Sequence, residues 1–90
     1  MFLHLGGDAV VPLREVVAIF DRELATQSRA AEEFLQTAKD EGFLIDVSGG
    51  RPKSFVLTSN RVYLSQISSV TLKKRAENIS EYLEELAKDS

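Results

Sequence analysis

Short apolar runs separated by turn residues fill most of the first two thirds of the chain, and such runs predict β-strands rather than long helices. The predicted strands are residues 1–5, 9–11, 15–20, 43–47, 54–58 and 61–65. Glu15–Phe20 could instead be one buried turn of a helix, but its β-branched residues favour a strand. Gly6-Gly7-Asp8 marks a turn between the first two strands. Pro12 has no amide donor, so it cannot occupy a central ladder position.

Residues 26–41 have the spacing of an amphipathic helix. Its apolar face consists of Ala30, Phe34, Leu35 and Ala38. Thr26 or Ser28 can cap the amino end through a hydroxyl oxygen. Gly42 follows the last turn and readily adopts the left-handed conformation that ends helices. The pattern therefore predicts one helix over Thr26–Glu41.

A second helix is predicted from a cap at Ser68 or Ser69 to near the end of the chain. Its apolar positions, spaced 4, 3, 4 and 3 residues apart, are Leu72, Ala76, Ile79, Leu83 and Leu86. This heptad-like seam is too short for a free-standing coiled coil. We therefore expect the seam to pack on the sheet or on another subunit.

Together these elements predict an α+β fold, with a small antiparallel sheet of about five strands, one helix between strands and one C-terminal helix. The strands between residues 43 and 65 are expected to form an antiparallel meander of two hairpins. A chain of 90 residues makes one domain, which we place at residues 1–76, followed by an acidic helical extension at residues 77–90. The chain has no cysteine for a disulfide, so oligomerisation is the expected support for its small core.

The charged residues are segregated along the chain. The protein is net acidic, at −3 from 11 basic and 14 acidic residues, yet no carboxylate lies between Asp46 and Glu77. The cations of this acid-free window are Arg51, Lys53, Arg61, Lys73, Lys74 and Arg75. A local positive field can bind a polyanion even when the total charge would repel it. The window therefore favours a polyanion such as DNA as a partner.

Ser48–Lys53 (SGGRPK) is the strongest local candidate for such a site. A glycine pair followed by Arg51 and Lys53 would place two cations on a hairpin tip with exposed backbone. Arginine offers a planar fork to phosphates or guanine edges, and lysine offers a point charge. An ordinary polar turn explains the same residues, so both interpretations stay open.

The basic residues further along the chain are candidates for DNA or interface contacts. Lys73, Lys74 and Arg75 open the second helix, but three consecutive residues span most of a turn and cannot all face one ligand. Glu77 lies within salt-bridge reach of this triplet, which favours a solvated face. Arg61 belongs to the same acid-free window.

Two cations outside the window are also candidates. Arg14 can lie on the same sheet surface as the hairpin tip. Arg29 stands in the first turn of the predicted helix, where a cation opposes the helix dipole. Either a functional role for Arg29 or chance would explain that placement.

The sequence shows no pattern of catalytic or cofactor-binding residues. Its glycines lack the spacing of a phosphate-binding loop, and its serines lack a motif that supplies a base. His4 is the single histidine and is expected to be a sheet residue rather than a ligand. We therefore expect a non-enzyme with no cofactor, no metal and no small-molecule substrate.

The sequence also lacks a membrane signal. No apolar run approaches the ~20 residues of a membrane span, and the amino end lacks the pattern of a signal peptide. We expect a cytoplasmic protein without a membrane partner.

Two long segments resemble a known family. HLGGDAVVPLREVVAIFD at His4–Asp21 and GRPKSFVLTSNRVYLSQISSVTLKKRA at Gly50–Ala76 are similar to the small bacterial RemA/RemB proteins, regulators of extracellular matrix genes in spore-forming bacteria. The similar motifs are the Gly-Gly-Asp turn, the Gly-Arg-Pro-Lys-Ser tip and the Leu-Lys-Lys-Arg helix start. The likeness is closer to the RemB branch, which shares the Lys-Lys-Arg segment.

The resemblance implies a DNA-binding transcriptional regulator that activates biofilm matrix operons. It also implies assembly into rings whose basic surfaces bind DNA cooperatively. By this resemblance, Arg51 and Lys53 occupy the basic hairpin tip. Arg14 lies beside the position of an arginine that contacts DNA in the RemA branch, and Glu15 takes the aligned position.

Two functions of different classes follow from these observations. The first is a homo-oligomeric DNA-binding regulator that uses Arg14, Arg29, Arg51 and Lys53, with Arg61, Lys73, Lys74 and Arg75 as further DNA or interface contacts. The second is a non-catalytic protein-interaction module that uses the acidic C-terminal helix and does not bind DNA directly. An enzyme acting on an anionic metabolite would need a polar cleft, for which the sequence gives no support.

Overall fold

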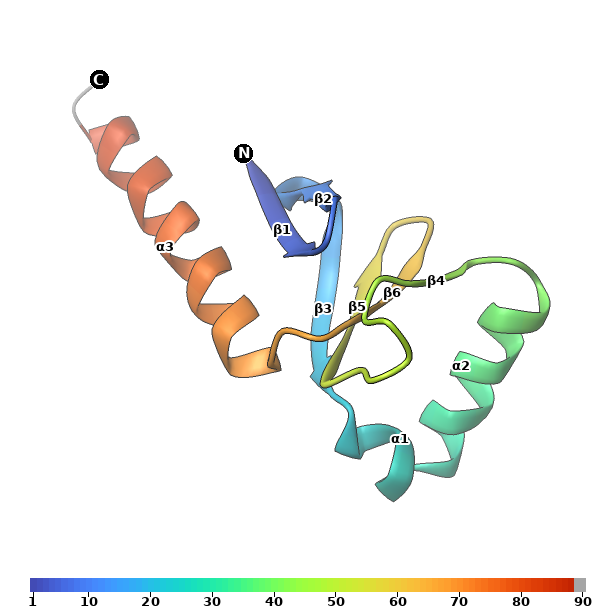
Figure 1. Ribbon diagram of the computed structural model, residues 1–90. Coiled ribbons are helices and arrows are strands. Elements are labelled where there is room, and N and C mark those ends of the chain that lie inside the picture. The colour runs from blue at the N-terminus through green and yellow to red at the C-terminus, as the bar shows by residue number, and fades with distance from the viewer. Residues whose placement is uncertain (89–90) are drawn as a thin grey trace.

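The chain forms two sheets of unequal size in the computed structural model, which describes the backbone of residues 1–88 and the side chains of residues 1–78 (Figure 1). The smaller sheet is an antiparallel ribbon of β1 (Phe2–Gly6) and β2 (Ala9–Pro12). The larger sheet consists, in spatial order, of β3 (Val16–Asp21), β5 (Ser54–Thr58), β6 (Val62–Ser65) and β4 (Leu44–Asp46). With its helices, the architecture confirms the predicted α+β class, with six strands in residues 1–88.

The ribbon formed by β1 and β2 follows the alternation of apolar and polar residues in its sequence. Leu3, Leu5 and Val11 are buried, whereas Phe2 and Val10 face outward. One-sided burial is the expected result of the period-two geometry of strands. A short 3-10 turn, Leu13–Glu15, then leads into β3, so the predicted strand at Glu15–Phe20 is confirmed from Val16 onward.

The predicted antiparallel meander is wrong in one of its two pairings. β5 and β6 form the expected antiparallel hairpin, but β4 pairs with β6, and the two strands are parallel. The reason is that β5 already has a partner on each edge, since β3 pairs with it on the side away from β6. β4 therefore takes the free edge of β6, and residues 47–53 cross over β6 to reach β5.

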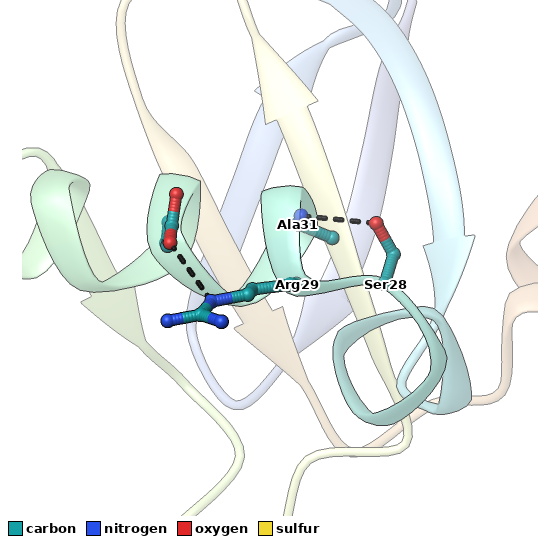
Figure 2. A network of polar contacts seen from close by, with 4 residues as sticks. Ser28, Arg29 and Ala31 are labelled. Carbon is teal, nitrogen blue, oxygen red and sulfur yellow. Dashed lines mark hydrogen bonds and ion pairs between the residues drawn. The ribbon is translucent and has the colours of Figure 1, made fainter.

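The helix predicted over Thr26–Glu41 is divided into α1 (Glu23–Gln27) and α2 (Arg29–Asp40). Ser28 separates them, because its backbone is extended and its Oγ accepts a hydrogen bond from the Ala31 amide at 3.2 Å (Figure 2). This geometry is that of an N-cap, so Ser28 starts a new helix rather than continuing the first. Gly42 has φ +82° and ends α2 as predicted.

The larger sheet is covered on both faces, because successive apolar side chains of β5 point to opposite faces and both faces are packed. Val56 lies against Leu3, Leu5 and Val11 of the ribbon and against Leu72 of α3 (Ser69–Lys88). On the opposite face, Phe55 and Val62 pack with Ala38 of α2. The result is a three-layer arrangement with the ribbon and the start of α3 on one side and α1 and α2 on the other (Figure 1).

The first part of α3 lies against the domain. Leu72 is fully buried, and the helix contacts β1 and β3. The backbone of its later turns extends past the rest of the chain, and the overall dimensions are 46 × 23 × 23 Å (Figure 1). The predicted seam is thus observed to pack on the sheet at Leu72, whereas the side chains of Ile79, Leu83 and Leu86 lie outside those that the structure describes. No helix within residues 1–88 has the length and apolar character to span a membrane.

Candidate nucleic-acid interface

The SGGRPK segment is a crossover between β4 and β5 rather than a hairpin tip. We call Ser48–Lys53 the basic loop. It lies at the end of the larger sheet where β3, β4 and β6 finish and β5 begins, which we call the loop end. The opposite end carries the β5–β6 turn, and we call it the turn end. Arg51 and Lys53 are both exposed at the loop end.

Backbone hydrogen bonds hold the second half of the basic loop. The Lys53 amide donates to the Ser65 carbonyl at 2.8 Å, and the Lys53 carbonyl accepts from the Arg22 amide at 3.0 Å. Gly49 and Gly50 have φ of +72° and +86°, a region that glycine adopts without steric cost. The backbone path of the loop therefore depends on the glycines at positions 49 and 50, and on backbone hydrogen bonds at Lys53.

A carboxylate holds the first half of the basic loop. Asp46 Oδ1 accepts from the Ser48 amide at 2.8 Å and also from the Ser48 hydroxyl. The Ser48 side chain and backbone hydrogen bonds, with a smaller contribution from the Gly50 amide, lower the pKa of Asp46 from its usual value. The Asp46 side chain is exposed, whereas Ser48, the first residue of the basic loop, is buried.

Arg22 is a cation of the loop end that the sequence interpretation missed. It follows β3 directly, and its amide is bonded to Lys53 because Asp21 pairs with Ser54 across β3 and β5. Arg22 and Arg51 line the same shallow hollow. Only the register of β3 against β5 brings Arg22 to the basic loop, and the sequence alone does not give that register.

Arg22, Arg51 and Lys53 form no ion pair with a carboxylate among the side chains that the structure describes. Asp21 already accepts two other hydrogen bonds, since its Oδ1 accepts from the Glu23 amide at 2.9 Å and its Oδ2 accepts from the Ser69 hydroxyl at 3.5 Å. Within residues 1–78 an ion pair is found at Arg29, and none involves Arg22, Arg51 or Lys53. Their charges are therefore available to a ligand in solvent.

The basic start of α3 lies toward the same end of the sheet. The hydrogen bond between Ser69 and Asp21 joins the first turn of α3 to the end of β3 (Figure 1). Ser68 is confirmed as a cap, because its Oγ accepts from the Thr71 amide at 3.2 Å. The exposed residues Lys73, Lys74 and Arg75 follow within about 10 Å of helix rise. The amino end of a helix carries partial positive charge, which adds to that of the side chains.

Arg29 is exposed at the first position of α2 and has a partner of its own. Its Nε donates to Glu33 Oε1 at 3.3 Å, one helical turn away (Figure 2). This i,i+4 ion pair explains why a cation is tolerated near the amino end of α2, so no ligand is needed to explain Arg29.

Arg14 and Arg61 lie at the turn end, so the expectation that Arg14 shares a surface with the basic loop is wrong. The Glu15 carbonyl accepts from the Ser59 amide at 3.0 Å, which fixes Arg14 beside the β5–β6 turn. Arg61 belongs to that turn, and its side chain donates to the Asn60 carbonyl at 3.1 Å. The six residues of β3 separate the two ends by about 20 Å.

This arrangement has the features of a surface that binds phosphates. Exposed cations from two separate segments, Arg22 and the basic loop, lie together at the loop end beside glycine-rich backbone, and no deep cleft is needed for their access. Those of α3 follow shortly after Ser69, which is bonded to Asp21 at the same end. Lysine and arginine side chains together with helix amino ends are the usual phosphate-binding groups of proteins that bind DNA.

Comparison with known proteins identifies the class of protein that carries this surface. A family model described as RemA-like, extracellular matrix regulatory protein A-like, matches residues 2–76. The chain therefore belongs to this family of extracellular matrix regulatory proteins, as its motifs indicated.

Two relatives refine the comparison. The chain is 46% identical over 77 residues to extracellular matrix regulatory protein B of Bacillus subtilis (strain 168), covering 86% of this chain and 91% of that protein. It is 37% identical over 75 residues to a protein of Nitratidesulfovibrio vulgaris (strain DP4) named as a regulatory protein, covering 81% and 83% respectively. The similarity to the B protein confirms the predicted likeness to the RemB branch.

Proposed function

We propose that this protein regulates extracellular matrix genes by binding DNA as a homo-oligomer, with the loop end facing the phosphates. The observation that carries the proposal is the backbone hydrogen bond between Arg22 and Lys53, which joins cations from two distant segments at one exposed site. In this proposal Arg22, Arg51 and Lys53 make the principal contacts, and Lys73, Lys74 and Arg75 extend the basic surface along α3.

The small number of cations per subunit supports assembly as part of the mechanism. Each phosphate that a protein neutralises on duplex DNA contributes about −0.9 to the slope of log affinity against log salt. Three principal cations therefore give weak binding by one subunit. Several subunits on the same DNA multiply these contacts through effective concentration. Such a regulator needs no catalytic group and no cofactor, and it acts in the cytoplasm, where the bacterial chromosome lies.

Two exposed apolar surfaces support self-association. Phe2 and Val10 are 64% and 56% exposed on the outer face of the ribbon. On the other side of the molecule, Phe34 and Phe43 are 48% and 45% exposed above a groove that Leu57 helps to line. Apolar patches of this kind mark interfaces, and two unlike patches on one chain favour head-to-tail assembly.

The turn end has a secondary place in this proposal. Arg14 and Arg61 lie at the end of the sheet opposite the basic loop of their own subunit, so they would reach the same DNA only from a neighbouring subunit. Arg29 is held by Glu33 and contributes less than the unpaired cations.

Light scattering coupled to size exclusion tests the proposal, with and without a promoter-sized duplex, at low and moderate salt. We expect one defined oligomer that takes up DNA at low salt and releases it as salt rises. A monomer, or an oligomer that does not take up DNA at low salt, would overturn the proposal.

A second function is favoured by the backbone of α3, whose later turns extend past the rest of the chain (Figure 1). This part of the sequence is acidic, with Glu77, Glu81, Glu84 and Glu85. It could be a docking site for another regulator, in which case residues 77–90 form a separate functional extension of the domain at residues 1–76. Truncation after Ala76 distinguishes the two functions, since it would preserve DNA binding by the loop end and remove a partner site on the helix.

A further inference from the structure

The two halves of the basic loop are held by different kinds of contact. The second half is fixed by main-chain bonds that any residue except proline could make, namely those of Lys53 with Ser65 and Arg22. The first half is fixed by one side chain, Asp46, which accepts two hydrogen bonds from Ser48. The glycine pair between these halves has the greatest conformational freedom of any residue type, so the contact at Ser48 limits what Gly49 and Gly50 can do.

The charge of Asp46 is unexpected at a surface that binds phosphates. This carboxylate is exposed and lies five residues before Arg51 in the chain. Its negative charge would repel DNA and would partly neutralise the field of the basic loop. Its presence is explained if the hydrogen bonds that it accepts matter more for DNA binding than the charge that it adds.

We infer that Asp46 is a positioning residue of the DNA-binding surface, which holds Ser48 so that the basic loop presents Arg51 and Lys53 to phosphates. This inference rests on the proposed function. The buried position of Ser48 supports it, because a buried hydroxyl that loses its acceptor is costly and the loop would rearrange to satisfy it. The lowered pKa of Asp46 agrees with hydrogen bonds that stabilise its ionised form.

Two substitutions at Asp46 separate its hydrogen bonds from its charge. Asp46→Asn and Asp46→Ala each remove one negative charge. Only Asp46→Asn keeps a side-chain oxygen that can accept from the Ser48 amide, as asparagine does in turns of this type. Any difference between the two variants therefore reports the hydrogen bonds rather than the electrostatic field.

The test is the affinity of the full chain for a random-sequence duplex at one low salt concentration. We expect Asp46→Asn to bind at least as tightly as the unmodified protein, because it keeps the turn and removes a repulsive charge. We expect Asp46→Ala to bind roughly threefold to tenfold more weakly than Asp46→Asn, the factor associated with one hydrogen bond. Equal affinities for the two variants would overturn the inference.

Asp40 provides a matched control on α2. It is an exposed carboxylate that accepts one side-chain hydrogen bond, from Gln36 at 2.9 Å, and it lies toward the turn end. Asp40→Asn and Asp40→Ala should bind the duplex equally. A difference between them as large as that at Asp46 would show that the effect is not specific to the basic loop, which also overturns the inference.

Two further variants keep the test decisive. If Asp46→Ala does not fold, Ser48→Ala removes the hydroxyl bond and keeps the amide bond, and it should weaken DNA binding while Asp46→Asn does not. Unchanged affinity in Ser48→Ala would then contradict the inference. The double variant Arg51→Ala/Lys53→Ala tests the proposed function itself. If it binds DNA normally, the proposed function fails, whatever the Asp46 variants show.

Discussion

The two ends of the larger sheet both carry exposed arginines, yet they differ in the direction of the helices beside them. At the loop end, α1 and α3 begin, so the positive ends of two helices lie near Arg22, Arg51 and Lys53. At the turn end α2 finishes, and Glu41 lies beside the same groove as Arg61. Carboxylates lie near the cations at both ends, since Glu23 lines the same hollow as Arg22 and Arg51. The direction of the helices is therefore the difference that favours an anion at the loop end.

The ends also differ in what holds their loops. The β5–β6 turn is closed by Thr58, whose Oγ1 accepts from the Arg61 amide at 3.0 Å and donates to the Arg61 carbonyl. The basic loop is longer, contains two glycines with positive φ, and is held by Asp46 and by the ends of two other strands. A local turn needs only its own residues, whereas the basic loop depends on the tertiary fold.

The largest predicted effect is loss of the packing that holds α3 at the loop end. Leu72 is fully buried against the ribbon and β5, so Leu72→Ala should lower the free energy of unfolding by about 2–5 kcal/mol. Chemical denaturation followed by circular dichroism measures this change. A loss below about 1 kcal/mol would show that α3 is not anchored there. Val70→Ala is the control, because Val70 is 62% exposed on the same helix.

A smaller effect on stability is predicted for Ser28→Ala. The Ser28 hydroxyl caps α2, so its removal should cost about 1 kcal/mol. The same denaturation experiment applies, with Thr26→Ala as a comparison, since the Thr26 hydroxyl donates to Glu23 within α1 rather than capping α2. Equal losses for the two variants would contradict the division of the helix at Ser28.

Removal of Arg22 tests whether the loop end extends beyond the basic loop itself. Arg22→Ala should weaken DNA binding and reduce the salt slope by about 0.9 for each bound subunit, because Arg22 has no carboxylate partner among the described side chains. Arg29→Ala should have less effect, since Glu33 already pairs with that guanidinium. Fluorescence anisotropy over a salt series measures both slopes, and a larger change for Arg29 would reverse the assignment.

The smallest predicted effect is a pH dependence at Asp46. Its pKa is lowered from 3.8 in the folded chain, so its ionised form contributes stability above that value, and this contribution is lost as pH falls through the lowered pKa. A titration of the carboxyl and of the Ser48 amide by NMR, from about pH 5 to about pH 2, should give a midpoint below 3.8. A midpoint at or above that value would show that the Ser48 contacts do not favour the ionised form.

Local signals in the sequence predicted the elements better than their pairing. The β5–β6 hairpin was predictable because Ser59-Asn60 lies between two short apolar runs, and Gly42 correctly marked the end of α2. The parallel pairing of β4 with β6 was not, since the pattern of a strand does not specify its partner. Ser28 was one of two candidate caps, with Thr26, but a continuous apolar face concealed the break beside it.

The candidate site shows the same limit. Arg51 and Lys53 became candidates because glycine, proline and basic residues occur together in the sequence. Arg22 was missed because it reaches the basic loop only through the register of β3 against β5. Arg14 was expected beside the basic loop, but it precedes β3 and the loop lies at the other end of that strand. Asp46 first appeared only as the boundary of the acid-free window, and its contacts with Ser48 required the fold.

The comparison of the two ends is tested most directly by two double variants that remove the same charge. Arg51→Ala/Lys53→Ala removes two cations from the loop end, and Arg14→Ala/Arg61→Ala removes two from the turn end. Duplex affinity is measured for both over one salt series, with light scattering to verify that each still assembles. We predict that the loop-end variant loses DNA binding and the turn-end variant retains most of it. Equal losses, or a greater loss at the turn end, would contradict the central claim that the loop end is the DNA-binding surface.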